Sequence, residues 1–362
     1  MNIEASVSER YSQGAMERQE SLCCPVNYDD GLLAILPEEI IAKDYGCGDP
    51  SRYVHEGDVV LDLGSGGGKI CYMAAQLVGR NGRVIGVDMN DDMLALARKY
   101  QREMTDKLGG DRVQFCKGQI QDLALDLDRL DAWLAQHPVS NETDYRELKA
   151  WETRQQHEQP MIADNSVDLV ISNCVLNLVA DEHKQQLLNE IRRVLKPGGR
   201  VAIADIVSDR PVPAGMKQDP ELWSGCISGA FQEQEFLAAF AGNGFHAVCY
   251  DKWDNEPWRT VNGIDFRSVT LTAIKSSADE TGAQNRELIY RGPFAEVVDD
   301  NGQHYRRGER TTVTADALAR LTNPAYDNAF IDMTDNGTAG TGGCCSIPVA
   351  TDAGKNSNGG CC

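Results

Sequence analysis

The sequence has no long apolar run and no excess of basic residues. No stretch reaches the roughly 18 apolar residues of a membrane-spanning helix. The chain carries 35 Lys and Arg against 55 Asp and Glu, for a formal net charge of −20. So much negative charge repels nucleic-acid phosphates and anionic lipid surfaces. We therefore expect neither nucleic acid nor a membrane as a partner.

The N-terminal segment has none of the features of a targeting peptide. Its first residues are polar and acidic and include no apolar core segment. We therefore expect a cytoplasmic protein, whose thiols stay reduced. Aromatic residues are few, at 7%, but a hydrophobic content of 41% suffices for a packed core. A chain of 362 residues can form one large domain or two.

Cysteine, by contrast, is plentiful, with 12 in the chain. In a cytoplasmic protein they require an explanation other than a disulfide framework. Six of them form adjacent pairs, which do not readily bridge each other: Cys23-Cys24, Cys344-Cys345 and Cys361-Cys362. The first pair could capture a soft metalloid or could be incidental.

Residues 58–90 carry the most informative pattern in the chain. A short apolar strand at 59–61 is followed by glycines at 64–68, an amphipathic helix to about residue 78, and a second strand at 83–87. This order is that of the first unit of a nucleotide-binding α/β sheet. Asp88 ends the second strand about 20 residues after the glycines, where a carboxylate can accept hydrogen bonds from ribose hydroxyls.

The glycine turn reads D-L-G-S-G-G-G, with Asp62 two residues before Gly64. This carboxylate would repel a pyrophosphate, but it suits the cationic end of S-adenosylmethionine (SAM). The alternative is an NAD-type or purely structural unit of the same kind. The stretch resembles motif I of class I SAM-dependent methyltransferases.

The remaining pattern favours an α/β fold of that class, with a mostly parallel Rossmann-like sheet and helices on both faces. Further strands are expected at 113–116, 166–173, 200–206 and 246–250. A last strand at 269–275 is expected to be antiparallel at an edge. In the methyltransferases that the chain resembles, Gln119 and Ile120 would contact adenine.

The expected domain organisation has four parts. Residues 1–30 would be a flexible arm or a first helix, and 31–276 the methyltransferase domain. A charged insertion at about 124–160 is expected to form two helices on its surface. Residues 277–333 would form a small α+β subdomain. The Gly-, Ser- and Asn-rich residues 334–362, which include two cysteine pairs, are expected to be disordered.

Four single cysteines lie where a ligand could reach them. Cys47 stands between glycines, which predicts an irregular, accessible loop. Cys71 lies in the first turn of a helix, where backbone N–H groups lower a thiol pKa. Cys174 follows the fourth strand, at the edge of the sheet that binds ligands. Cys226 follows Gly225 near Trp223, and core packing remains the alternative for Cys71 and Cys174.

These cysteines and their surroundings resemble the arsenite SAM methyltransferases over roughly 28–333. The matching segments are YGCG at 45–48, LDLGSG at 61–66, CY at 71–72, QLVG at 76–79, SNCVLNLV at 172–179, KPGG at 196–199 and LWSGCISGA at 222–230. The chain departs from the family at Ile70, where relatives carry an acid, and in its longer insertion.

The resemblance implies that trivalent arsenic is held by thiolates and methylated by SAM, in arsenic detoxification. Soft thiolates suit this thiophilic atom. Cys174 and Cys226 would be persistent ligands, with Cys71 or Cys47 as the third ligand or as a redox pair. We therefore predict Cys71, Cys174 and Cys226 as the arsenic site and Cys47, Cys71, Cys174 and Cys226 as the catalytic set.

The resemblance also implies the SAM site and the partners. The predicted SAM residues are Asp62, Gly64, Ser65, Gly66, Asp88, Met89, Gln119, Ile120 and Asn173. Arsenite or glutathione-bound arsenite would be the substrate, thioredoxin or glutathione the reductant, and the enzyme a monomer. Two alternatives stay open: a SAM methyltransferase of a small organic acceptor such as a quinone or sterol, and a non-catalytic metalloid-binding protein.

Overall fold

The computed structural model describes residues 3–17, 19, 26–276 and 286–333. The chain folds into two compact units, with the boundary between Asp279 and Glu280. The tail predicted to be disordered and all three adjacent cysteine pairs lie outside the described residues.

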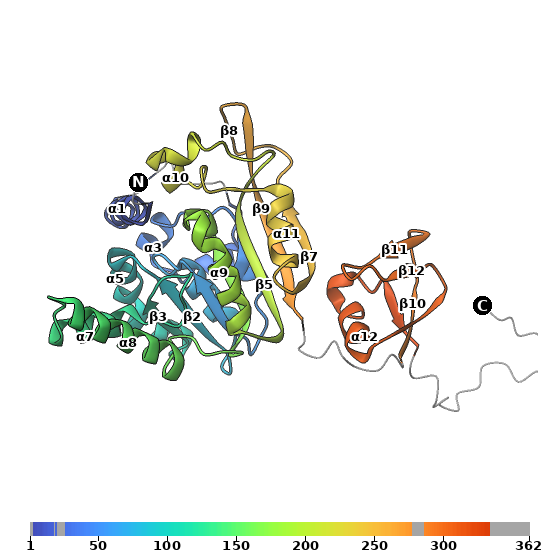
Figure 1. The fold of residues 1–362 in the computed structure, drawn as a ribbon, viewed down its shortest axis with the longest axis horizontal. Helices are drawn as coiled ribbons and strands as arrows, with labels where there is room; N and C mark the ends of the chain where they lie inside the picture. Colours follow the sequence, from blue (N-terminus) through green and yellow to red (C-terminus); the bar gives the residue numbers. More distant parts are fainter. Residues whose placement is uncertain (1–2, 18, 20–25, 277–285, 334–362) are drawn as a thin grey trace, which may run out of the picture. The chain divides into compact units, whose positions relative to one another are not determined.

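The first unit is built on a nine-stranded sheet with the order β3-β2-β1-β4-β5-β9-β7, to which β6 and β8 add at β5 and β9 (Figure 1). Strands β1 to β5 are parallel, as the sequence predicts. The order reverses between β1 and β4, and such switch points bind ligands at the carboxyl ends of the strands. The strands are β1 (Val59–Leu63), β2 (Arg83–Asp88), β3 (Val113–Lys117), β4 (Val167–Asn173), β5 (Leu195–Ser208), β6 (Phe231–Gln232), β7 (Phe245–Trp253), β8 (Arg259–Val261) and β9 (Ile264–Lys275).

The antiparallel end of the sheet differs from the prediction in one respect. The strand expected at 269–275 is part of β9, which is antiparallel to β5 as predicted. However, β9 is not at the edge, because β7 pairs with its other side. The period-two pattern of a strand does not distinguish a central from an edge position when both faces are covered.

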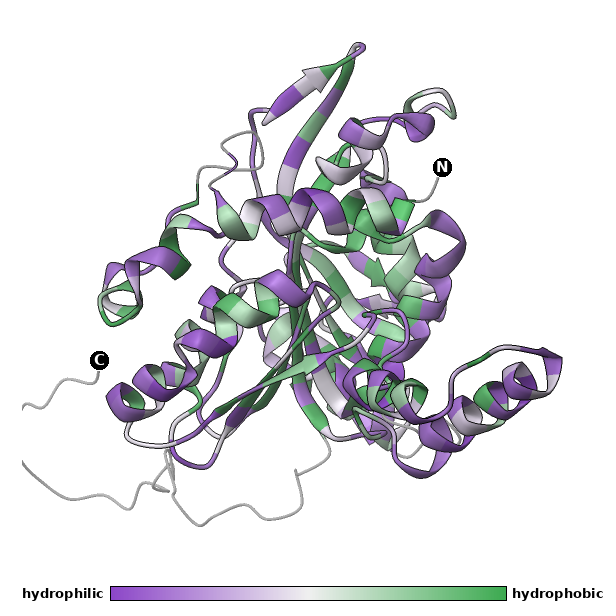
Figure 2. Ribbon diagram, turned by 90° about the vertical axis from the view of Figure 1, so that its left-hand side faces the viewer, coloured by the Kyte–Doolittle hydropathy of each residue, from purple (hydrophilic) through white to green (hydrophobic). Residues whose placement is uncertain are grey.

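Helices cover both faces of the sheet, and the strand residues alternate between two apolar clusters. Leu61 and Leu63 pack into one cluster, with α9 and α11, while Val60 packs into the other, with α4 and α6. Figure 2 shows the apolar residues of the strands between helices whose outer faces are polar. The helices of this unit are α1 (Ile3–Met16), α2 (Asp30–Leu33), α3 (Glu38–Ala42), α4 (Lys69–Leu77), α5 (Asp91–Lys99), α6 (Gln101–Leu108), α7 (Leu127–Gln136), α8 (Glu142–Glu158), α9 (Asp181–Val194), α10 (Pro220–Ser224) and α11 (Glu233–Ala241).

The charged insertion forms the helix pair α7 and α8, with Pro138 between them. Neither helix has a buried residue, and the two are joined by stacking of Trp133 on Trp151, with 5.5 Å between ring centroids. None of the helices in the described part of the chain is long and apolar enough to cross a membrane.

The second unit has a core of its own. Strands β10, β13 and β14 form an antiparallel sheet, and β11 pairs with β12. Helix α12 begins after Thr314, whose side chain caps it, close to where the sequence predicts a short helix. The elements are β10 (Arg286–Tyr290), β11 (Glu296–Val298), β12 (His304–Arg306), β13 (Arg310–Val313), α12 (Ala315–Leu321) and β14 (Phe330–Asp332).

Candidate active site

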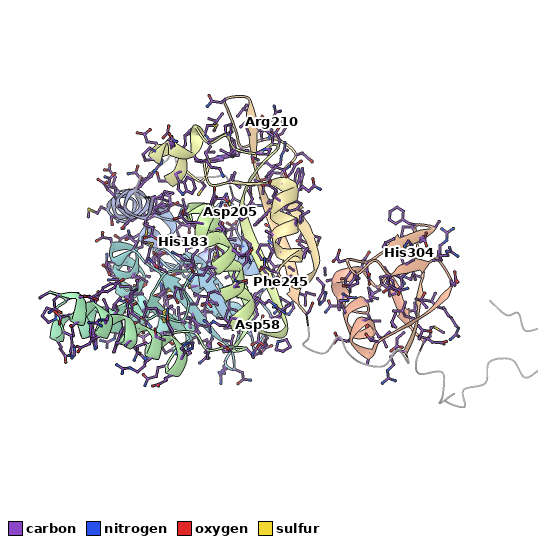
Figure 3. The ribbon with its side chains drawn as sticks, viewed as in Figure 1. Asp58, His183, Asp205, Arg210, Phe245 and His304 are labelled. Atoms are coloured by element: carbon purple, nitrogen blue, oxygen red, sulfur yellow. The ribbon has the colours of Figure 1, made fainter. Side chains whose placement is uncertain are left out.

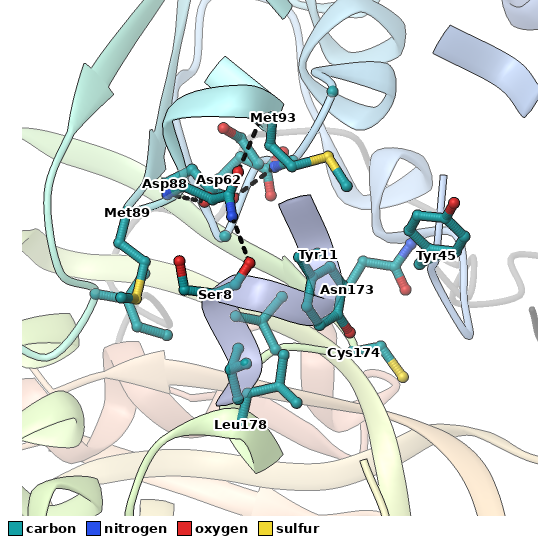
Figure 4. Close-up of a pocket in the computed structure, with 18 of the residues that line it drawn as sticks. Ser8, Tyr11, Tyr45, Asp62, Asp88, Met89, Met93, Asn173, Cys174 and Leu178 are labelled. Carbon is teal, nitrogen blue, oxygen red and sulfur yellow. Dashed lines mark hydrogen bonds between the residues drawn. The ribbon is translucent and has the colours of Figure 1, made fainter. Parts of the chain in front are cut away.

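A cleft opens at the carboxyl ends of β1, β2 and β4, which is where a parallel sheet of this kind binds its ligand. Its walls come from the glycine turn after β1, the loops after β2, β3 and β4, the segment 43–46, and one face of α1 (Figure 4). Most of the predicted SAM residues line it: Asp62, Gly64, Ser65, Gly66, Asp88, Met89, Ile120 and Asn173. Gln119 does not line it, whereas Gln121 does.

The glycine turn lies directly against the loop that carries Cys174. Gly64 has φ 69°, a left-handed conformation that favours glycine. A Cβ there would approach a Val175 methyl carbon to 2.4 Å, so a side chain cannot fit without displacing the loop after β4. Gly66 has φ 50° and its nearest such contact is at 4.0 Å, which leaves its backbone open toward the cleft.

Asp88 is held in place by the backbone of the same turn. Its carboxylate accepts hydrogen bonds from the N–H groups of Gly66, at 2.8 Å, and Asn90, at 2.9 Å. Burial raises the pKa of Asp88. A fixed carboxylate at the end of the second strand suits ribose hydroxyls.

Asp62 lines the cleft and is hydrogen-bonded to Cys71. The Cys71 thiol donates to Asp62 Oδ2 at 3.2 Å, and both side chains are buried. Burial raises the pKa of Asp62 to about 7, and burial together with Asp62 raises the pKa of Cys71. The expectation that the helix N-terminus lowers the Cys71 pKa is therefore wrong, because desolvation and the neighbouring acid outweigh the helix dipole.

The cleft residues fit SAM chemically. Asp62 and Asp88 supply acids for a cationic group and for a ribose. Ser65 Oγ is buried, and no group in the described part of the chain hydrogen-bonds it. An unpartnered hydroxyl of this kind is costly unless a ligand satisfies it.

Three of the four candidate cysteines meet in one apolar cluster, which we call the thiol end of the site. The cleft lined by Asp62 and Asp88 is its cofactor end. Cys47, Cys174 and Cys226 pack together there and are at most 5% exposed, whereas Cys71 packs in a different cluster. The sulfurs of Cys47 and Cys174 lie within 4.8 Å of each other. The Cys226 thiol donates to the Cys174 carbonyl oxygen at 3.3 Å.

Cys47 is buried rather than accessible, which corrects the prediction from its flanking glycines. A Cβ on Gly48 would lie 2.5 Å from the Ala204 Cβ, and one on Gly46 would lie 2.0 Å from Asn173 Nδ2. The glycines therefore allow the loop to pack directly on β4 and β5.

Asn173 fixes this loop. Its Oδ1 accepts from the N–H groups of Cys47, at 2.9 Å, and Gly48, at 3.0 Å, and its Nδ2 donates to the Gly48 carbonyl at 2.8 Å. The side chain predicted to bind SAM thus also holds Cys47 next to Cys174.

Two of the cysteines have an unusual backbone conformation. Cys174 has φ 65° and Cys226 has φ 61°, in the left-handed region that residues with a Cβ rarely adopt. Each such residue costs on the order of 1–3 kcal/mol and persists only when its surroundings fix it. Both backbones are held, by Cys174 N–H to the Ala204 carbonyl at 2.7 Å and by Cys226 N–H to the Trp223 carbonyl at 3.0 Å.

Asp205 is a site residue that the sequence reasoning missed. One of its oxygens lies within 4.8 Å of the sulfurs of both Cys47 and Cys174. Burial raises its pKa to about 7, although it accepts hydrogen bonds from backbone N–H groups, including that of Ile206 at 2.8 Å. Figure 3 shows Asp205 at the other end of the sheet from Asp58. The available signal was an acid inside the apolar strand segment 200–206.

Helix α1 was also missed as part of the site. Glu4, Val7, Ser8 and Tyr11 line the cleft, and Figure 4 shows Tyr11 beside Asn173 and Cys174. The sequence indicated a first helix as one option, but it carried no signal that this helix would cover the ligand cleft.

Comparisons with known proteins show which families and solved structures this chain is similar to. Residues 54–147 and 151–244 match a family described as a methyltransferase domain, and 278–341 match a domain of unknown function. The crystal structure of an arsenic(III) S-adenosylmethionine methyltransferase from Chlamydomonas reinhardtii is similar, with TM-score 0.57 and 26% identity, covering 87% of this chain and 98% of that one.

Curated relatives are similar over most of their length. An arsenite methyltransferase from Aquipseudomonas alcaligenes is 33% identical, covering 77% of this chain and 74% of the relative. The arsenite methyltransferase of Homo sapiens is 30% identical, covering 85% and 76%. With its class I sheet, its acid-flanked glycine turn and its converging thiols, this chain belongs to the arsenite methyltransferase family, whose methyl donor is SAM.

Proposed function

We propose that this enzyme transfers the methyl group of SAM to trivalent arsenic held by its own cysteine thiolates. The observation that carries the proposal is the convergence of Cys47, Cys174 and Cys226 in one apolar cluster next to the SAM cleft. The substrate would be arsenite or glutathione-bound arsenite, followed by methylarsenite. The chemistry of the site supports this because it offers several soft sulfur ligands within a small apolar volume.

Arsenite would bind by exchanging its hydroxyl groups for protein thiols. Each exchange forms an As–S bond, consumes one thiol proton and one As–OH group, and releases water. Three sulfurs leave arsenic pyramidal, with its lone pair free. Soft thiolates favour this atom over harder ions, and the apolar surroundings exclude competing water.

The cleft would align the two reactants. SAM supplies an electrophilic methyl group on a sulfonium sulfur. Asp88 and the Gly66 backbone would hold the ribose end, and Asp62 the cationic end. The arsenic lone pair forms the new As–C bond while the C–S bond breaks, and its electrons remain on sulfur. Positioning of this kind can contribute about 7–11 kcal/mol.

The structure favours Cys47 over Cys71 as the third sulfur. Cys47 lies near Cys174 in the same cluster, while the Cys71 thiol is bonded to Asp62 in another. The prediction that Cys71 is a ligand would require its side chain to leave this hydrogen bond. We therefore propose Cys47, Cys174 and Cys226 as the arsenic ligands in this conformation.

Methylation leaves arsenic formally oxidised by two electrons. Two of the arsenic-bound cysteine sulfurs can return these electrons: their As–S bonds break as an S–S bond forms, and the trivalent methylarsenic stays on the third sulfur, where water adds as hydroxide and releases a proton. Cys47 and Cys174 have sulfurs within 4.8 Å, and a bond needs them to approach to about 2.05 Å. Thioredoxin or glutathione would then reduce the disulfide and reset the enzyme.

The test is methylation of arsenite by purified protein with SAM and glutathione. Cys174→Ser and Cys226→Ser should each lose about 10²-fold or more in rate, because arsenic loses a soft ligand and its alignment. Cys249→Ser is the matched control, since Cys249 is exposed on β7 and should leave the rate unchanged. SAM binding should persist in all three variants.

Retained turnover of arsenite in either ligand variant would contradict the ligand assignment. Methylation of a quinone with none of arsenite would favour the organic-acceptor alternative, and no methyl transfer at all would favour a metalloid-binding protein.

A further inference from the structure

Hydrogen bonds from Asn90 connect helix α1 to the cofactor end of the site. Asn90 Nδ2 donates to the Ser8 carbonyl and to Ser12 Oγ, both at 3.0 Å. Asn90 is fixed in turn, because its Oδ1 caps α5 and its N–H donates to Asp88. The carboxylate placed for the ribose and the backbone of α1 therefore share one short chain of hydrogen bonds.

Hydrogen bonds from Arg10 connect the same helix to the segment that carries Cys226 at the thiol end. Arg10 Nη1 donates to the Glu221 carbonyl at 2.8 Å and to Ser224 Oγ at 2.9 Å. Both acceptors belong to α10, and Cys226 stands two residues after the end of that helix. A Cβ on Gly225 would lie 3.5 Å from Arg10 Nη1, so the guanidinium also lies close to the residue that precedes Cys226.

The segment that carries Cys226 is held by tertiary contacts, which include the two hydrogen bonds from Arg10 and one from Trp223 Nε1 to the Leu178 carbonyl oxygen at 3.1 Å. Helix α10 has five residues, too few to be stable without tertiary contacts. Cys226 has φ 61°, and its N–H donates to Trp223, within α10. If α10 shifts, the constraint on this strained residue is lost, and the sulfur moves with it.

Tyr11, the next residue of α1, lies between the two ends. It lines the cleft, and its ring packs edge-to-face on Tyr45 with 6.1 Å between centroids. Burial raises the pKa of Tyr11, and its neighbours Cys226 and Cys174 raise it further. One helix thus contacts the ribose side, the cleft wall and the thiol cluster.

We propose that Arg10 is a positioning residue that holds Cys226 for arsenic, and that α1 couples occupancy of the SAM cleft to the affinity of the thiol cluster for arsenite. The inference rests on the proposed arsenic ligands. A ligand that orders the ribose end restrains α1, and the restrained helix holds α10. Coupling of this kind is reciprocal, so arsenite must tighten the cleft by the same factor.

The experiment measures arsenite affinity by calorimetry with the full-length reduced protein, with and without S-adenosylhomocysteine, which occupies the cleft but cannot react. The three adjacent cysteine pairs, which could also bind arsenite, are replaced by serine in every protein compared. We expect S-adenosylhomocysteine to lower the arsenite Kd of the wild-type protein by about fivefold or more, the lower end of typical coupling. In Arg10→Ala, arsenite should bind about tenfold more weakly, since two hydrogen bonds from a charged donor are lost. The coupling factor, which is the ratio of the arsenite Kd without S-adenosylhomocysteine to the Kd with it, should fall toward one in this variant.

Three further variants separate positioning from general destabilisation. Glu9→Ala is the matched control, because Glu9 is the exposed neighbour on the same helix and should keep wild-type coupling. Arg10→Lys should restore part of the arsenite affinity through one remaining donor. Ser12→Ala should lower the coupling factor while leaving arsenite affinity unchanged in the empty cleft.

Each outcome has one meaning. A wild-type protein that binds no arsenite would remove the proposed ligands, whatever α1 does. Arsenite binding that S-adenosylhomocysteine leaves unchanged would remove the coupling alone. Wild-type coupling retained in Arg10→Ala would overturn the role of Arg10.

Discussion

The cofactor end and the thiol end of the site are built in opposite ways. At the cofactor end, Asp62, Asp88 and the Gly66 N–H group come from one continuous stretch, residues 62–90, although other segments complete the walls of the cleft. The thiol end assembles Cys47, Cys174, Asp205 and Cys226 from four separate segments, and most of its lining is apolar.

This difference explains how each end keeps its geometry. At the cofactor end, positive φ angles at Gly64 and Gly66 and the hydrogen bond from the Gly66 N–H group to Asp88 shape the turn within one βαβ unit. At the thiol end, long-range contacts must fix loops against one another: Asn173 holds the Cys47 loop and Arg10 holds the helix before Cys226. We therefore expect substitutions at the cofactor end to change SAM affinity. Substitutions of residues that support the cysteines from far along the chain should change arsenite affinity.

The largest effect is expected at Gly64, which joins the two ends. In Gly64→Ala the new Cβ collides with Val175, next to Cys174, and the residue keeps a strained positive φ. SAM binding and arsenite methylation should both fall by about 10²-fold or more. Calorimetry with SAM and a methylation assay measure this.

Gly57→Ala is the control, since Gly57 also has positive φ, at 88°, but a Cβ there meets nothing within 4 Å. It should cost stability only. If Gly64→Ala lost SAM binding but kept its arsenite affinity, the two ends would be independent at this point.

The second effect compares Cys47→Ser with Cys71→Ser. If Cys47 is the third sulfur, as we propose, Cys47→Ser should reduce methylation of arsenite by about 10²-fold and of methylarsenite by less, since one position of that substrate is already a methyl group. Cys71→Ser should lower the methylation rates of both substrates by the same small factor. Rates on the two substrates, measured in parallel, check this, and the reverse pattern would assign the third ligand to Cys71.

The smallest effect is expected at Asp62. Its pKa of about 7 means that it is mostly protonated at pH 6 and mostly ionised at pH 8. A cationic ligand favours the ionised form, so SAM affinity should rise up to about tenfold over this range. In Asp62→Asn, the affinity should be lower and nearly independent of pH.

The sign is the opposite for stability without SAM. The unfolded acid ionises near pH 4, so the raised folded pKa of Asp62 lowers stability as pH rises toward 7, and Asp62→Asn removes that slope. Denaturant titrations at several pH values measure it. A SAM affinity that stays constant from pH 6 to 8 in the wild-type protein would show that Asp62 does not face the cationic group.

Local patterns brought most of the residues predicted to bind SAM to one cleft. The strand, glycine turn and acid at 58–90 specify their own geometry, and eight of the nine predicted SAM residues line the cleft. The errors occur where burial decides. Cys47 was expected to be accessible and Cys71 to have a lowered pKa, but tertiary packing desolvates both.

The sequence by itself determined the class of sheet and the glycine turn after its first strand, and it placed Cys174 at the ligand-binding edge, because strand periodicity, glycine conformation and strand ends are local properties. Only the tertiary structure decided which sulfurs meet, that Asp205 joins them, and that α1 covers the cleft. Those facts depend on contacts between residues far apart in the sequence, such as Arg10 and Ser224, which are separated by 214 positions. A pattern of neighbouring residues does not predict which distant residues will meet.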